Sequence, residues 1–124
     1  MNYSVFGDSL CVISPHPDDE VLGCGGLIAK LVKKNIAVNV LIVCGHLPPI
    51  YKKEVFEKTR QEAIEASEIM GVKSIEFLKL SATFLHETPL HIFNSKILDF
   101  ISKNKATSMA LPFPDRHIDH KLIF

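Results

Sequence analysis

Strand-like runs alternate with helical segments along the whole chain, and this alternation constrains the fold more than any other feature. The runs have the length and composition of strands buried on both faces; they lie at residues 10–13, 36–44, 74–80 and 108–111. Segments with apolar residues at helical spacing separate them, at residues 20–34, 52–70 and 88–103. The pattern predicts a Rossmann-like parallel sheet with right-handed crossovers, flanked by helices in a three-layer α/β/α arrangement.

Residues at the ends of these segments support the assignment. Gly71 follows the second helix, where a left-handed cap is expected. Thr88 followed by Pro89 predicts an N-cap and the first position of the third helix. The last residues, HKLIF, predict the first turns of a fourth helix.

Composition sets limits on the class of protein. A chain of 124 residues predicts one domain, residues 1–124, with 47% hydrophobic residues. Lys+Arg and Asp+Glu both number 14, so charge offers no reason to expect nucleic acid as a partner. No apolar run approaches the roughly 20 residues of a membrane span, and the N-terminus lacks a signal-peptide pattern.

The three cysteines predict a reducing, cytoplasmic setting, because their number is odd and no CxxC spacing occurs. Cys11 and Cys44 lie in strand-like runs and are expected to be small buried hydrophobic residues. Cys24 is nearer the acids of the first loop, which leaves a thiolate metal ligand open there.

Two polar loops follow the first and fourth predicted strands. The first begins the stretch SPHPDDEVLGCGG, residues 14–26, and the second is PFPDRHIDH, residues 112–120. In parallel α/β sheets, ligands bind at the carboxyl ends of the strands, where the winding reverses. If the strand order is 3-2-1-4, the first and fourth strands are neighbours there. Both loops would then face one crevice.

The side chains of these loops suit a divalent metal. They include three of the six histidines and four aspartates: His16, His117, His120, Asp18, Asp19, Asp115 and Asp119. Catalytic zinc sites use three such ligands and leave one position open for water. His16 and Asp19 could share one ion, the second loop would supply a third ligand, and Asp18 would be free as a general base.

Two simpler interpretations stand beside the metal site. Acids at a helix N-terminus stabilise the helix by about 0.3–1 kcal/mol, so the first loop could be a capping sequence. Capping accounts for one acid, for which Glu20 is the simplest choice, but not for three acids and a histidine. The second loop could be a polar surface loop in which two histidines are incidental.

The motifs resemble a known family. Residues 16–20 (HPDDE) followed by residues 22–26 (LGCGG) are similar to the signature of the LmbE-like (PIG-L) zinc-dependent N-deacetylases. The second motif of that family, HxDH after a later strand, is matched by residues 117–120 (HIDH). Its Arg-x-Glu pattern on a helix ending in Gly-Val is matched by Arg60, Glu62 and Gly71-Val72. The resemblance covers nearly all of the chain.

The resemblance implies a role for each motif residue. His16, Asp19 and His120 would be the zinc ligands, and Asp18 the general base that activates the zinc-bound water. His117 would stabilise the developing oxyanion or protonate the leaving amine.

Three further residues are assigned more loosely. Asp119 would orient a histidine. Arg60 would help to hold the substrate, or would form an ion pair with a neighbouring glutamate on the helix surface. His46 lies where the family often has a Thr-Asp-Gly turn, and it would contact substrate or be a solvated loop residue.

The activity implied is hydrolysis of an acetamide, with zinc or another divalent metal as the cofactor. The implied substrate is a small N-acetylglucosaminyl-type sugar conjugate. Family members usually continue well past the second motif, so we expect residues 1–124 to be the N-terminal portion of the family fold, truncated at its C-terminus. Apolar surface left exposed by such a truncation would favour self-association.

Two other functions compete with this one. The first is a non-catalytic remnant that keeps the metal ligands and lacks the pocket. The second is a nucleotide-binding α/β module, with the GCGG of residues 23–26 as a phosphate loop. The second fits poorly, because acids precede the glycines and would repel phosphate.

Overall fold

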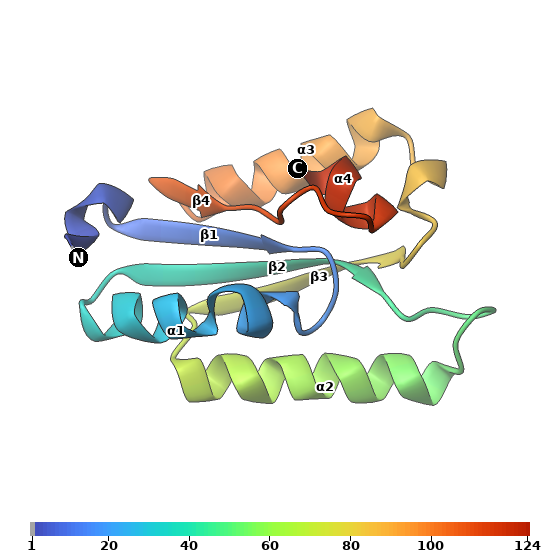
Figure 1. The fold of residues 1–124 in the computed structure, drawn as a ribbon, viewed down its shortest axis with the longest axis horizontal. Coiled ribbons are helices and arrows are strands. Elements are labelled where there is room, and N and C mark those ends of the chain that lie inside the picture. The colour runs from blue at the N-terminus through green and yellow to red at the C-terminus, as the bar shows by residue number, and fades with distance from the viewer. Residues whose placement is uncertain (1) are drawn as a thin grey trace.

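A computed structural model describes residues 2–124 and places four parallel strands in one sheet, in the order β3-β2-β1-β4 (Figure 1). The strands are β1 (Ser9–Ser14), β2 (Ala37–Gly45), β3 (Ser74–Ser81) and β4 (Ser108–Ala110). The helices are α1 (Asp19–Lys33), α2 (Lys53–Met70), α3 (Leu90–Lys103) and α4 (Ile118–Ile123), with 3₁₀ turns η1 (Tyr3–Phe6) and η2 (Leu85–Glu87). This is the order under which the sequence would bring the two polar loops to one crevice, and it makes β1 and β4 neighbours.

Helices cover both faces of the sheet, which confirms the three-layer prediction. Helices α1 and α2 lie on one face and α3 and α4 on the other (Figure 1). Each face has its own apolar cluster, because successive residues of a strand point to opposite faces. Leu10 and Val12 of β1 pack with Ile28 and Leu31 of α1, while Ile13 packs on the side of α3.

Two of the cysteines are buried within these clusters, as predicted. Cys11 and Cys44 are at most 1% exposed, and burial raises the pKa of the Cys11 thiol to about 11. Cys24 is partly buried, and its thiol donates a hydrogen bond to the carbonyl of Glu20. The backbone of α1 departs from helical geometry at Cys24, so the helix has a kink there.

Helix boundaries differ from the prediction at the start of α3. Pro89, and not Thr88, occupies the N-cap position, with φ −55° and ψ 130°. Thr88 instead closes the short turn η2, where its N–H donates to the carbonyl of Leu85. The 3₁₀ turn before the helix therefore displaces the start of α3 by one residue.

Gly71 ends α2 in the left-handed conformation, with φ 78° and ψ 27°, as predicted. A Cβ atom at this position would lie 2.8 Å from Cγ1 of Val32 on α1. We expect Gly71→Ala to lower the free energy of unfolding by about 1–2 kcal/mol, measured by urea titration.

The matched control for this substitution is Gly26→Ala in the helical part of α1, where a Cβ atom would have open space. Alanine restricts the unfolded chain and favours helix, so this variant should gain about 0.5–1 kcal/mol. Equal effects of the two substitutions would contradict the assigned cap.

No helix among residues 2–124 is both long enough and apolar enough to span a bilayer.

Candidate metal centre

The loops that follow β1 and β4 meet at one end of the sheet, because these two strands are neighbours. His16 comes from the first loop, while His117 is the N-cap of α4 and His120 lies in its first turn. The ring centroid of His16 lies 4.6 Å from that of His117 and 5.5 Å from that of His120. One ring nitrogen from each histidine lies within 4.8 Å of the others. Residues more than 100 positions apart thus form one histidine cluster: His16, His117 and His120.

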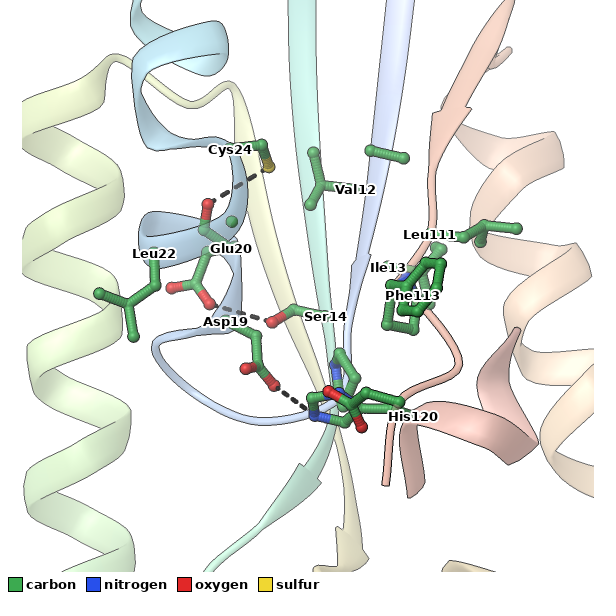
Figure 2. Close-up of a pocket in the computed structure, with 15 residues that line it drawn as sticks. Val12, Ile13, Ser14, Asp19, Glu20, Leu22, Cys24, Leu111, Phe113 and His120 are labelled. Carbon is green, nitrogen blue, oxygen red and sulfur yellow. Dashed lines mark hydrogen bonds and ion pairs between the residues drawn. The ribbon is translucent and has the colours of Figure 1, made fainter. Parts of the chain in front are cut away.

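Asp19 lies between two of these rings. Its Oδ2 atom is 3.3 Å from Nδ1 of His16 and 3.3 Å from Nε2 of His120. Figure 2 shows the Asp19 carboxylate turned toward the His120 ring. The structure therefore brings together the three residues that the family resemblance implied as ligands.

The donor set fits a zinc ion. Imidazole nitrogen and carboxylate oxygen are ordinary zinc ligands, and two ligand atoms at about 2.0–2.1 Å from a tetrahedral ion lie about 3.3 Å apart. Both distances from Asp19 Oδ2 have this value. Three protein donors also leave the fourth tetrahedral position for water or substrate.

Asp119 contacts the ring nitrogen of His16 that does not face Asp19. Its Oδ2 atom is 2.8 Å from Nε2 of His16, and it also accepts the N–H of Thr83 at 2.7 Å. The Asp119 side chain is completely buried. A histidine that binds metal through one nitrogen commonly gives its other N–H to a carboxylate. The contact is the one that the predicted orienting role requires.

Charge around His16 is strongly negative. Burial lowers the pKa of His16, but hydrogen bonds with Asp119 and Asp19 outweigh burial and raise this pKa to about 9. Burial would likewise raise the pKa of Asp119, yet His16 and the N–H of Thr83 hold it below its usual range. The two carboxylates therefore favour a cation between them.

His117 is oriented by the backbone of its own helix. Its Nδ1 atom accepts the N–H of Asp119 at 3.2 Å, as a side chain that caps the helix start. In neutral histidine only one nitrogen carries a proton. The proton of His117 is therefore on Nε2, where it is available for donation to a ligand, and this favours a hydrogen-bond donor over a metal ligand.

Asp18 has a strained backbone at the start of α1. Its φ is 139°, a value that residues with a side chain rarely adopt. Such strain is most often kept at functional sites. The pKa of its carboxyl group is raised, first by partial burial and then by the charge of Asp19, while His16 and His46 lower it less. A raised pKa makes a carboxylate a better general base.

Glu20 supports this strained turn from inside. Its side chain is 1% exposed, and its Oε2 atom accepts the N–H of Asp18 at 3.1 Å. The hydroxyl of Ser14 lies 3.0 Å from the same oxygen and 2.8 Å from the carbonyl oxygen of His16. Glu20 therefore caps the helix start, as expected, and also ties β1 to the loop that carries His16.

A cavity of about 520 Å³ opens beside the cluster, between the ends of β1 and β4 and the first turns of α1 (Figure 2). Asp19 and His120 reach its wall together with Asp115, and Leu22 and Phe113 give it apolar surface. The volume is in the range of small-molecule sites. Asp18 lines a second cavity of about 300 Å³, which lies between α1 and α2.

Two predicted substrate contacts lie apart from the described histidine cluster. The His46 ring is 6.4 Å from that of His16 and packs edge-on against Tyr51 at 4.7 Å, with Nδ1 buried. The guanidinium of Arg60 lies 4.9 Å from the ring centre of Phe77 on β3. The substrate roles of His46 and Arg60 stay predictions.

The structure also assigns contacts to residues that the motifs left without a role. Asp115 Oδ2 lies 3.0 Å from Nδ1 of His120. The sequence could have indicated this contact, because Asp115 precedes His120 by five residues in the same polar loop. Thr83 had no such signal, since only its backbone N–H takes part.

A second set of donors overlaps the first: His16, Cys44 and Asp119. Its members are more deeply buried. Burial raises the pKa of the Cys44 thiol far above its usual range, so the thiolate that a metal needs is disfavoured. Cys24, left open as a ligand by the sequence, belongs to neither set of donors found among residues 2–124.

Comparisons with known proteins point to one family. The model of the family described as PIG-L, GlcNAc-PI de-N-acetylase, matches residues 11–124. Diacetylchitobiose deacetylase from Thermococcus kodakarensis is 31% identical over 121 residues, which are 90% of this chain and 44% of that protein.

Solved structures share the fold. N,N'-diacetylchitobiose deacetylase from Pyrococcus horikoshii matches with a TM-score of 0.83 and 25% identity, over 98% of this chain and 49% of that one. A conserved protein from Thermus thermophilus, TT1542, matches with a TM-score of 0.77 and 28% identity, over 92% of this chain and 50% of that one. The chain thus spans about half the length of the proteins that it resembles.

Proposed function

The chain belongs to the PIG-L family of GlcNAc-PI de-N-acetylases, and on that premise we propose that it takes part in zinc-dependent removal of an acetyl group from an N-acetylated sugar conjugate. The observation that carries the proposal is the position of the Asp19 carboxylate, 3.3 Å from a ring nitrogen of both His16 and His120.

The three ligands in this proposal are His16, Asp19 and His120. When bound, zinc or another divalent metal supplies a Lewis acid that polarises the acetamide carbonyl and activates water. Asp119 keeps a proton on Nε2 of His16, which leaves Nδ1 free to face the ion. The nucleotide-binding alternative loses support, because residues 23–26 lie inside α1 and do not form a loop before it.

Two residues handle protons in this proposal. Asp18 accepts the proton of the attacking water, and its raised pKa suits that task. His117 carries its proton on Nε2, from which it donates a hydrogen bond to the oxygen on which charge develops or transfers the proton to the leaving amine. The strained backbone of Asp18, tied to buried Glu20, holds the base in place.

The substrate class in the proposal is an N-acetylglucosaminyl-type conjugate. The Thermococcus kodakarensis relative is named for diacetylchitobiose, a sugar of this kind. The cavity has room for a small sugar, and its apolar residues Leu22 and Phe113 offer a surface for a less polar group of the conjugate.

Metal content and acetate release test the proposal together. Metal-free protein is titrated with zinc, and acetate release is followed on diacetylchitobiose and N-acetylglucosamine before and after addition of a chelator. We expect one zinc per chain and acetate release that stops with the chelator and returns with zinc. Zinc binding without release would favour the non-catalytic remnant. Nucleotide binding without zinc would contradict the metal centre itself.

A further inference from the structure

We propose that Asp115 is a positioning residue that fixes the tautomer of His120, so that the free lone pair of Nε2 faces the metal position. The inference rests on the proposed function, since it concerns one of the three ligands named there. It goes further because it gives a task to a residue outside both family motifs.

The contact between the two side chains is direct. Asp115 Oδ2 lies 3.0 Å from Nδ1 of His120, whereas Nε2 of the same ring is 3.3 Å from Asp19. A carboxylate accepts hydrogen bonds and a neutral imidazole has a single N–H. The shorter contact places that proton on Nδ1, toward Asp115. Nε2 then keeps its lone pair on the side of Asp19 and His16.

Asp115 is itself held in place by backbone hydrogen bonds. Its Oδ1 atom accepts the N–H of His117 at 2.8 Å, and its own N–H donates to the carbonyl of Phe113 at 2.8 Å. The two carboxylate oxygens thus have different partners, one in the backbone before α4 and one in the ring of His120. The side chain is half exposed, so these hydrogen bonds, and not burial, hold it in place.

A merely structural role makes a different prediction from a positioning role. Asparagine in place of Asp115 keeps an oxygen for the N–H of His117, but it presents an NH₂ group to Nδ1 of His120. Two donors cannot pair, so the ring must accept at Nδ1 and carry its proton on Nε2. That tautomer has no lone pair toward the metal.

The experiment compares zinc affinity of the full chain with the variants Asp115→Asn and Asp115→Ala, by competition with a chromophoric chelator. We expect both to bind zinc 10–100-fold more weakly, as for other carboxylates behind a metal-binding histidine. A structural role predicts that Asp115→Asn binds like the unchanged protein. Asp99→Asn, the same change at an exposed position on α3, is the matched control and should have no effect.

A second measurement reads the tautomer without metal. In ¹H–¹⁵N spectra of the metal-free protein at mildly alkaline pH, the His120 proton should be on Nδ1, and in Asp115→Asn it should move to Nε2. Unchanged zinc affinity in Asp115→Asn, or a proton on Nε2 in the unchanged protein, would overturn the inference. If zinc affinity depends on Asp115 but no acetate is released, the positioning role of Asp115 is supported. Only the catalytic part of the proposed function is then contradicted.

Discussion

Replacing Asp18 with asparagine is expected to lower the rate of acetate release by two to four orders of magnitude while zinc stays bound. Asparagine has nearly the same size but cannot accept a proton from water, and a positioned general base contributes about 10²–10⁴-fold to rate. This corresponds to roughly 3–5 kcal/mol of transition-state stabilisation. Asp18 is not one of the three zinc ligands proposed above, so zinc affinity should hold.

Steady-state release of acetate and zinc content, measured on the same samples, check this prediction. Asp8→Asn is the matched control, because it makes the same chemical change at the opposite end of β1 and should leave both quantities unchanged. Unchanged acetate release in Asp18→Asn would remove Asp18 from the mechanism. Loss of zinc together with activity would instead make Asp18 a ligand.

Removing His16 is expected to have two separable effects. The variant His16→Ala loses one of three zinc donors, so zinc affinity should fall by more than about 100-fold, beyond the effect of losing a carboxylate behind a ligand. It also leaves Asp119, completely buried, without its nearest cationic partner. Breaking a buried pair costs about 3–5 kcal/mol of stability. We expect a loss near the lower end of this range, because the N–H of Thr83 still donates a hydrogen bond to the Asp119 carboxylate.

The comparison variant is His120→Ala. It should lose zinc to a similar degree, but its partners Asp115 and Asp19 are both partly exposed, so the metal-free protein should unfold at nearly the usual urea concentration. Chelator competition gives the zinc affinity, and urea titration of the metal-free proteins gives the stability. Retention of stoichiometric zinc in either variant would contradict the ligand set, and equal stability of the two would contradict the role of Asp119.

Local sequence predicted most of the fold. The apolar runs of β1 and β2 and the cap at Gly71 depend on interactions within or next to the element, so the pattern alone was enough. The assignment of Thr88 as the N-cap of α3 was wrong, because Thr88 is the C-cap of the short turn η2 and Pro89 takes the N-cap position. Such a turn follows from the packing of Leu85 beneath it, which local pattern does not reveal.

The sequence predicted only part of the candidate site. The motifs pointed to His16, Asp19 and His120, and these side chains do lie together. The guanidinium of Arg60 lies over the ring of Phe77, and its role as a substrate contact stays a prediction. The pairing of Asp115 with His120 depends on the turn before α4, in which Asp115 also accepts the N–H of His117, and the residue pattern did not specify the shape of that turn.

By itself the sequence determined the layered parallel fold and the kinds of side chain at the two strand ends, because periodicity and residue chemistry are local properties. Only the tertiary structure decided which atoms face each other. Strand order places residue 16 beside residue 120, and the buried contact of Asp119 with both His16 and Thr83 joins α4 to the first and third strand ends. Those contacts turn a set of polar residues into a site with one oriented nitrogen for each proposed histidine ligand.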